Sequence, residues 1–160
     1  GEYRFTSVRE GNRSGRAAIG IDFKSADPKS ALELNEDPRG HDACFELSGQ
    51  IATEGRVWVD AQTFDVLRVE QHIEGPTGIQ VPIKLQRRDG LPDSVTLDRD
   101  DLTMDYKVVT FTDPGDALLL PASIDEIELW RGGLQSERRS DTYSDYRRFL
   151  TDGRVVKDER

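Results

Sequence analysis

The chain has 160 residues, a third of them charged, and 31 acidic against 22 basic residues give it a formal net charge of −9. This length is typical of one domain that buries a sizeable core. The acidic balance argues against nucleic acid or an anionic membrane surface as the main partner. No apolar run approaches the roughly 20 residues of a membrane-spanning helix. A single cysteine, Cys44, cannot form a disulfide within the chain.

Alternation of apolar and polar residues dominates the N-terminal part, and helical periodicity is nearly absent. Tyr3–Glu10 and Arg16–Lys24 flank a stretch rich in turn-forming residues, which predicts a β-hairpin. In the second strand the apolar residues share one face: Ala17, Ile19, Ile21 and Phe23. Asp27–Asp42 is polar and carries two prolines, so we expect a long loop with at most one helical turn near Ser30–Leu34.

The stretch Gly55–Ile73 predicts a second hairpin, whose two faces are very unequal. Apolar residues share one parity, namely Val57, Val59, Leu67, Val69 and Ile73, whereas Trp58 stands among charges on the other. Asp60 is placed to accept backbone hydrogen bonds in an Asx-type turn. The register that satisfies most cross-strand pairs sets Trp58 opposite Arg68, Arg56 opposite Glu70, Glu54 opposite His72, Val57 opposite Val69 and Val59 opposite Leu67.

Further strands are expected in the second half of the chain. Ile79–Leu85 alternates, with Pro82 indicating an edge strand or a bulge. Ser94–Leu97 and Leu102–Thr112 follow, and two long strands surround Gly132–Gly133. The fold class is therefore mainly β: one antiparallel, strongly curved sheet that forms an incomplete barrel with little helix. Residues 1–160 make one domain, with the sheet in residues 1–150 and a charged tail in residues 151–160.

Four stretches resemble exported bacterial proteins of the lipoprotein-carrier type, the LolA/LolB/RseB-like superfamily: Gly15–Phe23, Gly55–Glu70, Leu118–Leu129 and Ser144–Phe149. The resemblance implies an incomplete barrel whose concave side is capped by helices, and an exported, periplasmic location. Phe64 stands where the family hairpin usually carries a glycine, which suggests a different turn or an exposed apolar side chain. Since the chain begins within a strand and shows almost no helix, we expect an N-terminal part to be missing.

These features favour a non-enzymatic carrier or binding module that holds an acyl chain or similar amphiphile on a concave apolar sheet face. The candidate lining residues are Val57, Val59, Leu67, Val69, Ile127, Leu129, Ile19, Ile21 and Phe23. In this interpretation the Trp58 face points outward, and Arg56 and Arg68 flank the indole as cation–π partners. The alternative is an envelope-sensing or protein-interaction module that acts through a sheet edge and its outer face, with Trp58 and Phe64 exposed. The oligomeric state stays open.

Catalytic and metal motifs are mostly absent, so we expect no enzyme activity, no cofactor and no metal. His41 and Cys44 form an H-x-x-C pair, but a structural zinc site needs four ligands. The acidic stretch Asp98–Asp105 departs from the EF-hand pattern, because Leu102 occupies a ligand position. Asp125, Glu126 and Glu128 could serve a hydrolase only if two of them met in a cleft.

Overall fold

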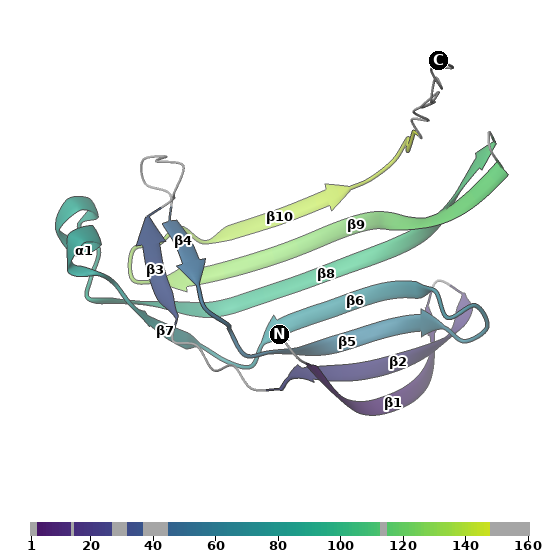
Figure 1. Ribbon diagram of the computed structural model, residues 1–160, viewed down its shortest axis with the longest axis horizontal. Helices are drawn as coiled ribbons and strands as arrows, with labels where there is room; N and C mark the ends of the chain where they lie inside the picture. Colours follow the sequence, from purple (N-terminus) through teal and green to yellow (C-terminus); the bar gives the residue numbers. More distant parts are fainter. Residues whose placement is uncertain (1–2, 14, 27–31, 37–44, 113–114, 148–160) are drawn as a thin grey trace, which may run out of the picture.

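The computed structural model describes residues 3–13, 15–26, 32–36, 45–112 and 115–147, which form ten strands and one helix. The elements are β1 (Tyr3–Arg13), β2 (Arg16–Ser25), β3 (Glu33–Glu36), β4 (Phe45–Ser48), β5 (Thr53–Asp60), β6 (Val66–Ile73), β7 (Thr77–Gln80), α1 (Ile83–Asp89), β8 (Ser94–Thr112), β9 (Gly115–Arg131) and β10 (Glu137–Thr142). The long strands lie side by side in one curved sheet, with α1, β3 and β4 gathered at one end (Figure 1). The prediction of a mainly β, incompletely closed sheet is confirmed.

Strand β8 organises this sheet, because it pairs with three others. One edge of β8 pairs with β9, which in turn pairs with β10. The other edge pairs with β7 near Ser94–Leu97 and with β6 along Asp101–Asp105, so β6 and β7 act as two segments of one interrupted strand. Beyond β6 the order is β5, β2 and β1. All ladders are antiparallel except the contact of β3 with β7, so the sheet is mixed rather than purely antiparallel.

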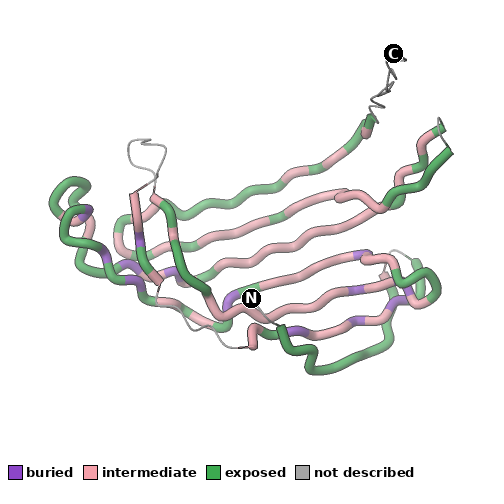
Figure 2. The backbone as a smooth tube through the Cα atoms, in the orientation of Figure 1, coloured by how far each residue is buried: buried purple, intermediate pink, exposed green. Residues whose placement is uncertain are grey.

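The main hydrophobic core lies at the end of the sheet that carries α1, β3 and β7, where buried positions gather in Figure 2. Its buried members are Leu34, Ile73, Ile79, Val81, Leu85, Val95 and Leu97. A second, smaller cluster joins only Ala18, Trp58 and Leu67. The sheet between these clusters carries no fully developed core among the described residues.

Three predicted elements differ from the structure. Pro82 does not mark an edge strand: β7 ends before it, and its carbonyl accepts hydrogen bonds from Leu85 and Gln86 in the first turn of α1. Pro82 is the N-cap residue with an extended ψ of 139°, and Gly90 ends the helix in the left-handed conformation. Within the expected loop at Asp27–Asp42, Glu33–Glu36 form β3, whereas residues 27–31 and 37–44 lie outside the described residues. The two strands expected at Ser94–Leu97 and Leu102–Thr112 join into the single strand β8.

The predicted β5–β6 register is confirmed from Glu54 to Trp58 and fails beyond it. Val59 pairs with Val66, not with Leu67, because a β-bulge interrupts β6. The extra residue, Leu67, packs with Trp58 and Ala18 and is only 9% exposed. The predicted Asx turn is confirmed, since Asp60 accepts hydrogen bonds from the backbone of Gln62 and Thr63 at 2.8 and 3.1 Å.

Candidate functional site: the two faces of the curved sheet

An unbroken row of apolar side chains crosses the sheet on one face. The strand registers place these residues opposite one another in turn: Val8, Ile21, Val57, Val69, Met104 and Ile124. They come from β1, β2, β5, β6, β8 and β9, and we call them the apolar row. The row ends at Asp141 on β10, which lies opposite Ile124 and pairs with Arg139. Six strands therefore contribute to an apolar surface that has a charged end.

The apolar row is only partly shielded from solvent. Val8 is 68% exposed, and its five partners are half-buried. None of the six belongs to either hydrophobic cluster. Tyr3 and Phe5 on β1 extend the exposed apolar surface and are 49% and 70% exposed. Contiguous apolar surface of this kind is typical of an interaction site.

The predicted lining residues divide between the two faces. Ile19 and Val59 lie beside the apolar row and on its face, as strand alternation requires. Phe23 shares that face: it is 7% exposed and reaches over Gly55, and Tyr3 packs edge-on against its ring. Leu67, Ile127 and Leu129 do not join them. The bulge in β6 turns Leu67 towards Trp58. Ile127 and Leu129 lie on the opposite face, because each is an odd number of residues from Ile124 along β9.

Trp58 lies on the opposite face, and the prediction that it is exposed is wrong: it is 4% exposed. Its ring lies over the backbone of Gly11 and Gly20, where no side chain stands in the way. The guanidinium of Arg13 stacks 3.8 Å from the ring centroid, and that of Arg56 lies at 5.4 Å. Arg56 is thus a cation–π partner as predicted. Arg13, from a strand distant in sequence, was missed.

Arg68 is not a partner of the indole but part of a network of charges. It donates to Glu70 at 2.8 Å and to Asp105 at 3.1 Å. The indole N–H of Trp58 donates to the other oxygen of Glu70 at 3.2 Å. This network links β5, β6 and β8 on what we call the charged face.

Asp22 is the centre of a second network on the charged face. It accepts hydrogen bonds from Arg56 at 2.5 Å, from Ser7 at 2.5 Å and from Arg9 at 2.7 Å. The Arg56 guanidinium, followed by the Ser7 hydroxyl, holds the pKa of Asp22 well below its usual range. In the described part of the charged face, Asp22, Glu70 and Asp105 each accept a hydrogen bond from an arginine side chain.

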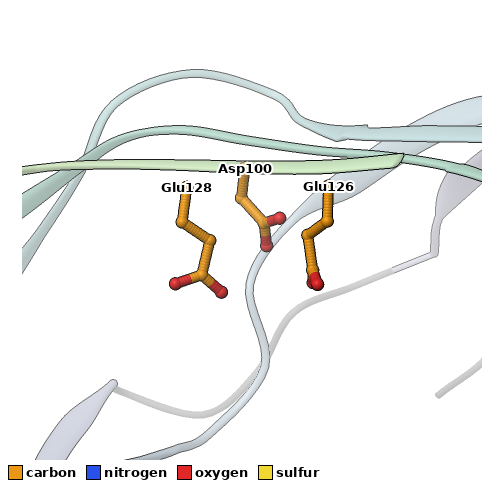
Figure 3. Close-up of side chains that lie close together, drawn as sticks. All are labelled: Asp100, Glu126 and Glu128. Atoms are coloured by element: carbon orange, nitrogen blue, oxygen red, sulfur yellow. The ribbon is translucent and has the colours of Figure 1, made fainter. Parts of the chain in front are cut away.

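Three carboxylates meet on the apolar-row face, at the far side of the sheet. Asp100, Glu126 and Glu128 come from β8 and β9 and point to the same side in Figure 3. Their nearest oxygens all lie within 4.8 Å of one another. Burial, followed by repulsion from Glu128 and Glu126, raises the pKa of Asp100 to about 6.

Asp100, Glu126 and Glu128 form a cluster of like charges that repel one another. Among the described residues it is the one group whose oxygens could share a metal ion, yet calcium takes six to eight oxygen ligands. The sequence grouped Glu126 and Glu128 with Asp125, but Asp125 lies on the opposite face and accepts a hydrogen bond from Ser140. Asp100 was missed as their neighbour, because its proximity depends on the β8–β9 register.

The other predicted metal candidates form no such group among the described residues. His72 contacts Glu54 at 3.2 Å, and His41 and Cys44 lie outside the described residues. Within the stretch Asp98–Asp105, Asp98 pairs with Arg131 and Asp101 with Arg99. Phe64 is 70% exposed at the tip of the β5–β6 turn, as predicted for an apolar side chain there.

No helix in the described part of the chain has both the length and the apolar character needed to cross a membrane. The chain matches no protein-family model, no curated protein and no solved structure.

Proposed function

We propose that this chain is a non-enzymatic binding module that holds an amphiphile by laying its acyl chain along the apolar row. One observation carries the proposal: six apolar side chains from six neighbouring strands follow one another without a polar interruption, and none is part of a hydrophobic cluster. A ligand on this row would remove from water apolar surface that the described residues leave accessible.

The dimensions and chemistry of the row suit an extended hydrocarbon. Neighbouring strands lie about 4.8 Å apart, so six strands span roughly 24 Å. That distance is comparable to the length of a long acyl chain. Met104 is the fifth of the six residues in the row, and its flexible thioether side chain adapts to irregular apolar partners. Each buried methylene contributes about 0.8 kcal/mol to binding before the entropic costs.

The resemblance to exported lipoprotein carriers supports the same kind of ligand and an exported, periplasmic location. The apolar row differs in two respects from the lining residues that the sequence predicts. Val8, Met104 and Ile124 enter it through the strand registers, and Leu67, Ile127 and Leu129 leave it because they lie on the charged face. Trp58 is also excluded as an outward contact, since it is buried.

The test is titration with 11-(dansylamino)undecanoic acid, whose emission increases when its environment becomes apolar. We expect saturable binding that Met104→Gln weakens several-fold, because an amide then interrupts the row. Ile127→Gln is the matched control: Ile127 is also half-buried, on a neighbouring long strand, but it lies on the opposite face.

Two results would overturn the proposal. One is absence of saturable binding by the unmodified, folded chain. The other is equal loss of binding in both variants, which would place the probe elsewhere or indicate general unfolding. Circular dichroism of each variant separates a loss of binding from a loss of the sheet. Native mass spectrometry of the purified chain adds an independent measurement, since a retained lipid would be released on denaturation.

A further inference from the structure

The β8–β9 hairpin extends beyond the rest of the sheet. Pairing of β8 with β6 ends at Asp105, whereas pairing with β9 continues to Thr112. From Tyr106 to Thr112 one edge of β8 therefore has no partner strand among the described elements. Figure 1 shows the two strands running past the ends of β5 and β6. An unpaired edge of seven residues offers a row of backbone donors and acceptors to an incoming strand.

A hollow of about 790 Å³ lies at this fork. It is lined on one side by the free part of β8 and on the other by residues of β1, β2 and β6. The charged residues that line it are Arg13, Arg16, Arg68, Lys107, Glu70 and Asp105. Four cations against two carboxylates give a positive hollow in a chain whose net charge is −9.

Not all of these cations are neutralised internally. Arg68 binds Glu70 and Asp105, and Arg16 lies 3.3 Å from Asp60. Arg13 stacks on an aromatic ring and donates to a backbone carbonyl, and Lys107 donates to the carbonyl of Tyr143 at 2.7 Å. Neither Arg13 nor Lys107 has a carboxylate partner among the described residues. Both remain available to an anionic partner.

We propose that the free edge of β8 accepts an extended peptide with alternating acidic and apolar residues as an added strand. Backbone hydrogen bonds to the edge would supply affinity, and alternate side chains would supply specificity. Along β8, Lys107 points to the charged face, whereas Tyr106 and Val108 belong to the other parity. Acidic side chains of the peptide would then face Lys107 and Arg13, and apolar ones would cover Val108, which is 47% exposed.

This site is separate from the apolar row, so either proposal can fail without the other. The probe is a fluorescein-labelled peptide of four Glu-Val repeats, and its anisotropy is followed against the full chain. We expect saturable binding that is weakened about two- to fivefold in Lys107→Gln and in Arg13→Gln, the range for an exposed charge pair. Arg4→Gln is the control, because Arg4 lies on β1 and donates to the carbonyl of Ala26, away from the hollow. Lys107→Gln keeps the test valid if Arg13→Gln loses stability.

Hydrogen exchange distinguishes an added strand from a bound anion. Strand addition should slow exchange of alternate amides between Tyr106 and Thr112, since every second N–H points to the free edge. A peptide of four Lys-Val repeats should not bind. The proposal is overturned if the Glu-Val peptide fails to bind, if the Lys-Val peptide binds equally well, or if glutarate competes fully and the amides of β8 stay unprotected. The last result would assign the hollow to small anions.

Discussion

The guanidinium of Arg13 lies 3.8 Å from the centroid of the Trp58 ring, where the indole from β5 lies over Gly20 of β2 and Gly11 of β1. The two residues are 45 positions apart, and the stacking joins the edge strand to the third strand of the sheet. It explains how a tryptophan on a charged face is only 4% exposed. On this face the guanidinium of Arg13 covers the Trp58 ring, as a second layer of hydrophobic side chains would in a two-layer protein.

Removing Arg13 should therefore expose Trp58 and destabilise the edge strand. We expect Arg13→Ala to lower the free energy of unfolding by about 1 kcal/mol, since cation–π pairs contribute about 0.5–2 kcal/mol. Urea unfolding measures this value. The emission of Trp58 should shift to longer wavelength, recorded in a Trp130→Phe background so that one indole reports. Arg4→Ala should leave both quantities nearly unchanged; an equal effect of Arg4→Ala would contradict a specific role for the stack.

The glycines under the indole should tolerate no side chain. A Cβ at Gly20 would lie 2.9 Å from Cζ3 of Trp58, and one at Gly11 would lie 2.8 Å from the same atom. We expect Gly20→Ala to cost about 1–3 kcal/mol, as overpacking does. Thermal unfolding provides the comparison with Gly78→Ala, where a Cβ meets open space within a strand. If Gly20→Ala were as stable as Gly78→Ala, the close packing of the ring on β2 would be wrong.

Phe64 should be replaceable with a gain in stability. Its φ of +61° is in the left-handed region, which costs residues other than glycine about 1–2 kcal/mol, and its side chain is 70% exposed. Glycine relieves the strain but gives the unfolded chain more freedom, so we expect Phe64→Gly to add up to about 1 kcal/mol to the free energy of unfolding. Phe64→Ala keeps the positive φ and should add nothing. A loss of stability in Phe64→Gly would show that the phenyl ring makes a stabilising contact.

Much of the hairpin β5–β6 could be predicted from the sequence, because the pairs Arg56–Glu70 and Val57–Val69 are compatible only in one register. The bulge at Leu67 could not, since its position depends on packing against Ala18 and Trp58 from other parts of the chain. The same bulge changes which face Leu67 occupies. A two-residue period holds only as far as the next irregularity in the ladder.

The same distinction between local pattern and long-range packing applies to the site residues. Ile21, Val57 and Val69 were predictable from alternation within their own strands. The coincidence of these residues in one row with Met104 and Ile124 follows from registers between strands, which no local pattern contains. Pro82 was misinterpreted for another reason: a short alternating apolar run fits a strand or a helix, and only the position of Leu85 in the main core favours the helix.

Asp100 should make stability depend on pH between about 4 and 6. Its pKa is raised from 3.8 to about 6, chiefly by burial and by Glu128, so the folded chain binds more protons than the unfolded chain in this range. The free energy of unfolding should therefore fall as the pH rises from 4 to 6, and the loss should persist at higher pH. Asp100→Asn removes the cost of a third charge and should raise the free energy of unfolding at pH 7.5 by about 1–2 kcal/mol, allowing for partial exposure.

The control for this effect is Asp125→Asn, because Asp125 lies next to Glu126 on β9 but faces the other side and accepts a hydrogen bond from Ser140 at 2.6 Å. Urea unfolding at pH 4, 5, 6 and 7.5 compares the two variants with the unmodified chain. The difference between Asp100→Asn and the unmodified chain should be small at pH 4 and should grow through pH 6. A difference that stays constant with pH would mean that Asp100 acts through packing, and that repulsion from Glu126 and Glu128 does not set its pKa.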